Sequence, residues 1–248
     1  MTTGALARVH AAHADAWEVE GRLRERHGGG VLEVRGIRLM ASGLKPAQWN
    51  SGDVSAPDAD VEAARGFYAA RGADWGVRVP AGMPWRHGRR LLTLDLMALG
   101  PEDFAPVTAD EHIAVRPATR DDLETVVAID AAAFGEDPDD ERSWLAPHLG
   151  APVITTALAT LDGEPVGTGY AIRSDGLAGP ALYLAGVGVA PRARRRGVGA
   201  AVSSWLVATG LETGAELVHL HAEDDDAARL YARLGFARAP GLDVYVDL

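Results

Sequence analysis

The sequence predicts a mixed α/β protein in which helices cover a sheet. Two observations lead to this class. Residues 153–160 and 165–173 form an apolar strand pair around the turn Leu161-Asp162-Gly163-Glu164, a hairpin signal, and the strands that follow are linked through helices. The composition agrees, since 47% hydrophobic and 24% charged residues are typical of a globular protein. A chain of 248 residues suits one large domain or two small ones.

A domain boundary is predicted near residue 110. Residues 100–111 are mostly polar and contain Pro101 and Pro106, a composition that is common in connections between domains. We therefore expect two domains, one formed by residues 1–109 and the other by residues 113–248.

Hydrophobic spacing and capping residues predict the elements of the second half. Thr119 and Asp122 have the spacing of a capping box, which begins a helix that runs towards Phe134. The acidic run at 136–141 is expected to be a solvated loop. The other expected elements are strands at 113–116, 153–160, 165–173 and 181–189, a helix with Val198, Val202, Trp205 and Leu206 on one face, a strand at 216–222, a helix at 225–234, and a terminal strand pair around 236 and at 242–246.

The first half repeats part of this pattern. A helix at 64–71 before Gly72 resembles the helix at 225–234 before Gly235, and the match aligns Tyr68 with Tyr231. Strands at 31–34, 37–42 and 91–99 are also expected. Junctions of helix, glycine and strand are common, so the repeat alone leaves a duplication open.

Charge and residue usage exclude several classes of function. A net charge of −11 argues against binding to nucleic acid or to an anionic membrane. The absence of cysteine excludes disulfides, thiolate metal sites and cysteine nucleophiles. His10 and His13 lack a third ligand at suitable spacing, so no metal is expected. The longest apolar run, residues 181–191, is far shorter than the roughly 20 residues that span a bilayer, and we expect a cytoplasmic protein.

Residues 184–200 carry the strongest chemical signal. An apolar strand ends at Pro191, a turn follows, and Gly197 and Gly199 open a helix. A helix N-terminus presents unpaired N–H groups and attracts anions, and glycines let a phosphate approach the backbone. The turn adds positive charge through Arg192, Arg194, Arg195 and Arg196. The segment therefore predicts a phosphate-binding turn.

Known phosphate motifs narrow the choice of ligand. The dinucleotide motif Gly-x-Gly-x-x-Gly fails because Pro191 or Val202 stands at its third glycine, and a Walker A motif fails because no lysine follows the glycines. The motif that fits is Arg-x-x-Gly-x-Gly at residues 194–199. With it, residues 113–248 resemble the GCN5-related N-acetyltransferases, the GNAT superfamily. The resemblance implies a GNAT fold for this half and a degenerate GNAT-like fold for residues 1–109, which lack the motif.

The resemblance also implies acetyl-CoA as a co-substrate. The backbone of Val187 and Val189 would pair with the pantetheine arm, and the turn would hold the pyrophosphate. Gly186 and Gly188 suit a bulged strand at this place. The contacts implied are Val187, Gly188, Val189, Arg194, Arg195, Arg196, Gly197, Val198, Gly199, Ala200 and Asp224.

A second family motif, Asn-x-x-Ala-x-x-x-Tyr-x-x-x-Gly-Phe, is matched at residues 224–236. The resemblance makes Tyr231 the general acid that protonates the departing CoA thiolate; a tyrosine that only packs is the alternative. Asp224 replaces the asparagine of the motif, so an amide-donated contact to the cofactor is lost. Its carboxylate is expected to cap the helix instead.

A general base is harder to assign. Many relatives carry a glutamate on the strand before the phosphate turn or on its neighbour, but residues 181–189 contain no carboxylate. Glu223, at the end of the next strand, is the nearest candidate. His221 is a second, sharing a strand face with His219 and Glu223, and water is a third.

These features predict an acyl-CoA-dependent N-acyltransferase that acetylates an amine by direct attack. The acceptor would be a small molecule or a peptide, and an acidic run at 136–141 would suit a cationic one. The first half, with Trp49, Trp75 and Trp85 in its core or at an interface, would shape a cleft for the acceptor. One alternative is a non-catalytic acyl-CoA-binding module, which the missing strand carboxylate and Asp224 favour. Another is a nucleotide-sugar or dinucleotide binder. A monomer and a homodimer are both compatible with the sequence.

Overall fold

The computed structural model describes residues 3–248, with side chains from Arg8 onward. The strands are β1 (Gly30–Val34), β2 (Ile37–Ala41), β3 (Ser51–Val54), β4 (Gly76–Pro80), β5 (Arg89–Leu99), β6 (Ile113–Pro117), β7 (Ile154–Leu161), β8 (Glu164–Gly176), β9 (Gly179–Val189), β10 (Leu217–Ala222), β11 (Ala237–Arg238) and β12 (Leu242–Val246). The helices are α1 (Thr3–Leu23), α2 (Val61–Ala69), α3 (Leu123–Phe134), α4 (Pro138–Leu145), α5 (Val198–Glu212) and α6 (Asp225–Arg233). The predicted mixed α/β class is confirmed.

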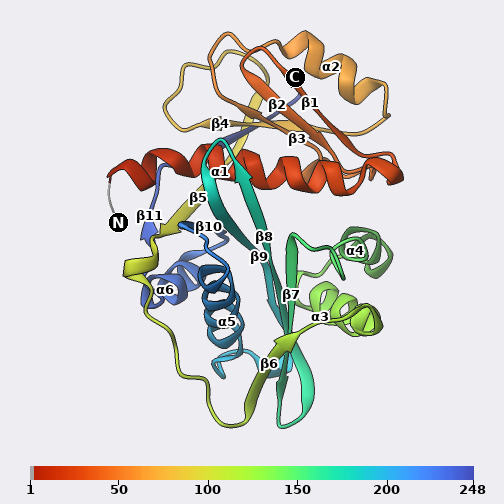
Figure 1. Ribbon diagram of the computed structural model, residues 1–248. Helices are drawn as coiled ribbons and strands as arrows, with labels where there is room; N and C mark the ends of the chain where they lie inside the picture. The colour runs from red at the N-terminus through yellow and green to blue at the C-terminus, as the bar shows by residue number, and fades with distance from the viewer. Residues whose placement is uncertain (1–2) are drawn as a thin grey trace.

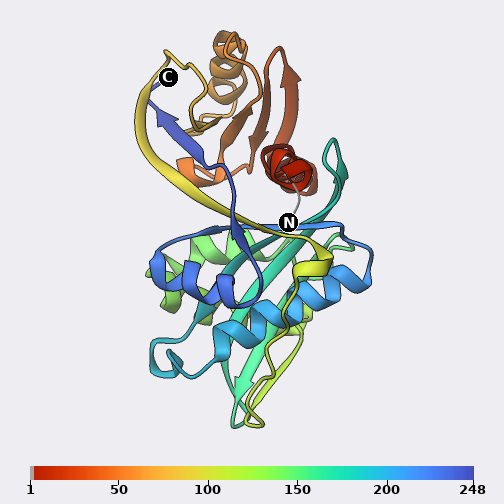
Figure 2. The same cartoon turned by 90° about the vertical axis from the view of Figure 1, so that its left-hand side faces the viewer.

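All strands belong to one mixed sheet. Its order is β1-β2-β3-β4-β12-β5-β10-β9-β8-β7-β6, and β11 pairs with β5 outside this path. In Figure 1, β1 to β4 and α2 form the upper part, and β6 to β10 form the lower part with α3 and α4 on one face and α5 and α6 on the other. The long helix α1 crosses the junction between the two parts, where Figure 2 shows it end-on.

Hydrophobic faces explain how the helices cover the lower sheet. Val198, Val202 and Leu206 of α5 are buried against the sheet, as their helical spacing predicts. On the other face, Ala16 of α1 and Trp144 of α4 join the core formed with α3 and β8. The capping box expected at Thr119 and Asp122 is present, in a short 3₁₀ turn that leads into α3.

Two strands cross the predicted boundary near residue 110. β5 precedes the boundary, yet it pairs antiparallel with β10 of the lower part. β12 follows it, yet it lies between β4 and β5 and pairs antiparallel with both. Each half therefore receives a strand from the other, which Figure 2 shows as two ribbons that run between the upper and lower parts.

Three local expectations differ from the structure. The run at 136–141 is a loop only in its first part, because Asp137 accepts hydrogen bonds from the backbone N–H groups of Asp139 and Asp140 and Pro138 begins α4. The terminal strands β11 and β12 pair with β5 rather than with each other. Finally, α2 connects the parallel neighbours β3 and β4, as α5 connects β9 and β10, so its position corresponds to α5 and not to the helix of Tyr231.

Among the described residues, no helix is both long enough and apolar enough to cross a membrane.

Candidate functional site

The centre of the candidate site is an opening between β9 and β10. The two strands pair in parallel only where residues 181–183 face residues 217–219, and beyond that point they separate. Within β9, the pairing with β8 shifts register between Thr168 and Tyr170, which leaves a bulge opposite Gly169. Gly186 lies in this bulge at φ +59, and a Cβ there would meet the ring of Tyr170 at 2.5 Å. A glycine is therefore required here, as the sequence predicts.

A groove of about 720 Å³ lies on one side of this opening. It brings together almost all residues that the sequence assigned to the cofactor and to catalysis: Val187, Gly188, Val189, Arg194, Arg195, Gly197, Val198, Gly199, Ala200, Glu223, Asp224 and Tyr231. Arg196 is the exception, since its guanidinium lies 3.8 Å from the carboxylate of Asp162, outside the groove. The lining also includes Phe134, Arg229 and Arg233, which were not predicted as site residues.

The turn between β9 and α5 has the geometry of an anion site. Gly197 is the N-cap of α5 at φ +87, and no described side chain caps this helix N-terminus. Arg194 is fixed by a hydrogen bond from Nη2 to the carbonyl of Ala133 (2.7 Å). Arg195, in the left-handed region at φ +63, faces Asp226 with an N–O distance of 3.2 Å. Free N–H groups and arginines thus converge on one end of the groove, which fits a pyrophosphate.

Tyr231 and Asp224 are positioned by α6. The Asp224 carboxylate accepts a hydrogen bond from the N–H of Ala227 (2.8 Å), which confirms the predicted N-cap. Tyr231 is buried, and burial raises the pKa of its phenol to about 12. Its phenol therefore stays protonated at neutral pH.

The base candidates on β10 separate in the structure. Glu223 is exposed and lines the groove together with Tyr231. His221 lines the opposite side of the opening, and burial lowers the pKa of its imidazole. His219 is fully buried and stacks on Tyr183 at 5.0 Å, so it reaches neither side.

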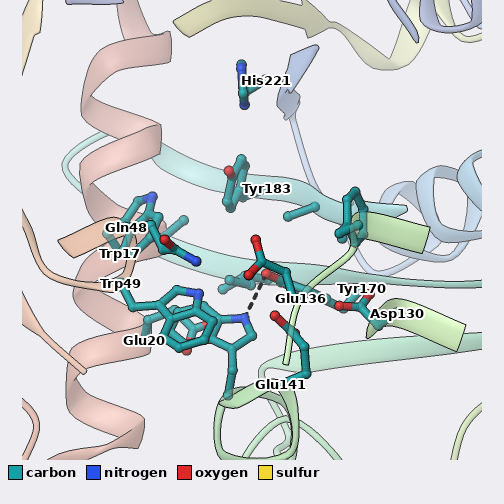
Figure 3. A pocket seen from close by; sticks show the side chains of 16 residues that line it. Trp17, Glu20, Gln48, Trp49, Asp130, Glu136, Glu141, Tyr170, Tyr183 and His221 are labelled. Carbon is teal, nitrogen blue, oxygen red and sulfur yellow. Dashed lines mark hydrogen bonds between the residues drawn. The ribbon is translucent and has the colours of Figure 1, made fainter. Parts of the chain in front are cut away.

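A second cavity, of about 350 Å³, lies on the other side of the opening. Figure 3 shows its labelled side chains converging from α1, from the loop of Gln48 and Trp49, and from the elements of the lower part. Phe134 lines both the cavity and the groove, and Ala185 and Gly186 of the cavity lead directly into Val187 of the groove. The remaining lining residues are Ala16, Trp17, Glu20, Gln48, Trp49, Asp130, Glu136, Glu141, Trp144, Tyr170, Ile172, Tyr183 and His221.

Two buried carboxyl groups of this cavity approach each other. Asp130 of α3 and Glu141 of α4 are each 5% exposed. Burial and then the hydrogen bond and charge of Glu141 raise the pKa of Asp130 to about 9. Burial also raises the pKa of Glu141. The hydrogen bond between the two groups raises the pKa of Asp130 and lowers that of Glu141, so it favours a protonated Asp130 that donates to a charged Glu141.

Comparisons with known proteins identify the domain around these sites. Residues 123–236 match the acetyltransferase (GNAT) family. The chain carries a GNAT acetyltransferase domain. This membership confirms the predicted family and the predicted enzyme class, an N-acetyltransferase.

Solved structures extend the likeness from this domain to the fold of the whole chain. A GCN5-related N-acetyltransferase from Kribbella flavida has a TM-score of 0.74 at 22% identity, covering 100% of this chain and 96% of that one. A conserved protein of unknown function from Staphylococcus epidermidis has a TM-score of 0.66 at 14% identity, covering 89% and 95%. A GCN5-related N-acetyltransferase from Sphaerobacter thermophilus has a TM-score of 0.57 at 17% identity, covering 94% and 92%. These likenesses show the fold. No curated protein matches the chain.

The residues of the groove were predicted from the sequence, whereas most residues of the cavity were not. Asp130 and Glu141 lie among residues expected to form a helix and a loop, and neither belongs to a motif. Trp17 and Trp144 are isolated tryptophans in the sequence. Only the acidic run at 136–141 gave a signal, through its suitability for a cationic acceptor.

Proposed function

We propose that this protein transfers the acetyl group of acetyl-CoA to an amine that binds between its two halves. The observation that carries the proposal is the position of the groove and the cavity, which meet at Phe134 and at the bulge of β9. Residues 113–248 would form the catalytic domain. Residues 1–109 would be a degenerate GNAT-like domain that supplies one wall of the cavity, and the shared order of three antiparallel strands, a helix and a parallel strand supports this.

The groove residues have separate roles in this proposal. The N-terminus of α5 and Arg194 and Arg195 would hold the pyrophosphate, while the backbone of Val187 to Val189 would pair with the pantetheine arm. The acetyl thioester supplies the electrophilic carbonyl. An N–H group in the bulge, where β8 leaves the backbone unpaired, would donate a hydrogen bond to the carbonyl oxygen.

The proposed acetyl transfer is a direct substitution at the thioester carbonyl. The neutral amine attacks the carbonyl carbon, a C–N bond forms, and the C–S bond breaks. Tyr231 donates its proton to the sulfur, and the amine releases one proton, for which Glu223, His221 and water are the acceptors considered from the sequence. Tyr231 would regain a proton from solvent through the groove that it lines.

Thermal-shift titration with acetyl-CoA, CoA and NAD tests the groove. A ligand at 100 times its Kd stabilises the folded protein by about 2.7 kcal/mol, so both CoA species should raise Tm and NAD should leave it unchanged. The absence of a shift with either CoA species would contradict the groove assignment. Acetyl transfer across a panel of amines separates an enzyme from a module that only binds acyl-CoA.

Replacing Tyr231 by Phe tests the general acid. The phenol oxygen is the only atom removed, so turnover should fall about 100-fold while acetyl-CoA affinity stays within a few-fold. Steady-state kinetics and calorimetry measure the two quantities. Tyr245→Phe, on β12 in the upper part of the sheet, is the matched control. Unchanged turnover per bound cofactor in Tyr231→Phe would reject the acid role.

A further inference from the structure

The cavity beside the groove has the properties of a site for a cation. We propose that it binds a compact organic ammonium ion with an aromatic or other flat apolar body, and that the Asp130–Glu141 pair binds the ammonium group. The inference rests on the proposed function, since it names the class of amine that would be acetylated.

The lining of the cavity contains more acidic than basic side chains. Four carboxylate side chains line it, and no arginine or lysine is among its described lining residues. The charge of Glu20 is neutralised, because its carboxylate lies 3.2 Å from Nε of Arg24 and 2.8 Å from Nε2 of His148. Among the residues described, neither Asp130 nor Glu141 forms a salt bridge, and His148, whose charge lowers the pKa of Glu141, is already paired with Glu20 at 2.8 Å. Their negative charge is left for a ligand.

The Asp130–Glu141 pair is buried, and one of its oxygen atoms lacks a hydrogen bond. Oδ1 of Asp130 is buried and has no hydrogen-bond partner among the residues whose side chains are described. Leaving such an acceptor unsatisfied costs about 1–3 kcal/mol, whereas a bound N–H donor would satisfy it. Figure 3 shows the carboxyl groups of Glu141 and Glu136 directed towards the middle of the cavity.

The aromatic walls indicate what accompanies the charge. Trp49 and Trp144 stack with an interplanar angle of 7° and a centroid separation of 5.3 Å, and Nε1 of Trp144 donates a hydrogen bond to the hydroxyl of Tyr170 (3.3 Å), as Figure 3 shows. Trp17, Tyr183 and Phe134 complete the aromatic lining. Flat apolar groups and cations both bind favourably to such rings.

The size of the cavity limits the ligand. At about 30 Å³ per non-hydrogen atom, the share of a water molecule in the liquid, 350 Å³ holds roughly a dozen such atoms. A phenylethyl ammonium ion fits this volume, and a trisaccharide polycation does not.

The position of the Asp130–Glu141 pair suits acetyl transfer to an amine bound there. A Cβ built on Gly188 would lie 3.6 Å from Oδ1 of Asp130 and 3.2 Å from the ring of Phe134. Asp130 thus borders the strand that would hold the thioester, so an ammonium nitrogen bound to the pair lies near the bulge of β9.

Calorimetric titration with 2-phenylethylamine, 2-phenylethanol and kanamycin tests the inference, with quenching of tryptophan fluorescence as a second readout because Trp17, Trp49 and Trp144 line the cavity. We expect saturable binding of the amine, at least tenfold weaker binding of the neutral alcohol, and no binding of kanamycin in the cavity. Equal binding of amine and alcohol, or no binding of the amine at millimolar concentration, would overturn the inference.

Variants of the pair sharpen the test. Asp130→Asn and Glu141→Gln each leave one carboxyl group and therefore one negative charge, so each should bind the amine within a few-fold of the wild type. The double variant has no charge and should bind at least tenfold more weakly. Glu124→Gln with Asp139→Asn, exposed carboxylates of the same two helices, is the matched double control.

The outcomes of this test are distinct. CoA-dependent thermal stabilisation of the double variant shows that it has folded, and undiminished amine binding by that folded variant would reject the role of the pair. Binding of 2-phenylethylamine without acetylation would leave the cavity assignment standing and would contradict the proposed function instead.

Discussion

Gly199 lies in the first turn of α5, where the absence of a side chain leaves the backbone of the predicted phosphate-binding turn open to the groove. A Cβ at this position would lie 3.6 Å from Leu230 and Val189, which is ordinary van der Waals contact. The protein alone therefore tolerates a methyl group here. The groove in front of Gly199 is the space that such a group would occupy.

Gly199→Ala should therefore separate binding from folding. We expect unchanged or slightly higher thermal stability, since alanine favours a helix over glycine by about 0.5–1 kcal/mol, and CoA affinity reduced roughly tenfold or more through a lost phosphate contact. Gly66→Ala in α2, where a Cβ meets nothing within 4 Å, is the matched control. It should gain stability and keep its CoA affinity. If Gly199→Ala bound CoA as tightly as the wild type, the pyrophosphate would not lie on this turn.

At the level of elements, the packing of α3 against α4 brings Asp130 and Glu141 together, and the folded protein must take up a proton there. The ordinary pKa of an aspartate is about 3.9, and the folded value is about 9. Because the pKa of Asp130 is higher in the folded than in the unfolded protein, protonation of Asp130 stabilises the folded state. This stabilisation is complete below pH 4 and is lost as the pH rises towards 9.

Asp130→Asn should make stability less sensitive to pH. In the wild type this group lowers the free energy of unfolding by about 1.4 kcal/mol per pH unit between pH 5 and pH 8, and the asparagine removes that slope. Urea unfolding at several pH values measures it. The pH dependence of the free energy of unfolding of Glu124→Gln, on the exposed side of α3, should parallel that of the wild type. A parallel profile for Asp130→Asn as well would show that Asp130 is ionised in the folded protein.

The same pair of helices shows what the sequence could and could not predict. Most of the strands, α5, α6 and the residues of the groove followed from alternation, capping and the motif at 194–199, all of which are local signals. β3 and β4 were not among the strands expected by residue range. α4 also carried a local signal, since Asp137 and Pro138 are favoured residues at the N-cap and first position of a helix. The acidic composition of residues 136–141 favoured a loop instead, so the start of α4 was not predicted. The meeting of Asp130 with Glu141 depends on tertiary packing, for which a single sequence gives no periodic pattern.

At the scale of the whole molecule, the cavity exists because α1 and the loop of Trp49 lie against the GNAT domain. Buried polar contacts cross this junction. The carboxylate of Glu20 lies 2.8 Å from Nε2 of His148, and Nη2 of Arg24 donates a hydrogen bond to the carbonyl of Trp144 (2.5 Å). The carboxylate of Asp15 accepts a hydrogen bond from the N–H of Ala178 (2.8 Å). The pairing of β5 with β10 and of β12 with β4 adds backbone hydrogen bonds across the same boundary. We therefore expect the two predicted domains to unfold together.

Residues 113–248 expressed alone should not form a stable monomer. The fragment lacks β5, so β10 presents an open edge, and β12 loses both of its partners. We expect aggregation or a broad unfolding transition in calorimetry and size-exclusion chromatography. Addition of residues 1–109 as a separate chain should restore a sharp transition. A fragment that unfolds cooperatively as a monomer would show that the exchanged strands are dispensable.

The exchange of strands also determines when the upper part of the sheet can be completed during synthesis of the chain. A ribosome releases β1 to β4 early, but the place between β4 and β5 is filled only by residues 242–246, which are made after the entire GNAT domain. At a synthesis rate of about 5–20 residues per second, the upper sheet waits many seconds with a gap in it. Unpaired strand edges can pair with other chains, so we expect the nascent chain to be the form of this protein most exposed to misassembly.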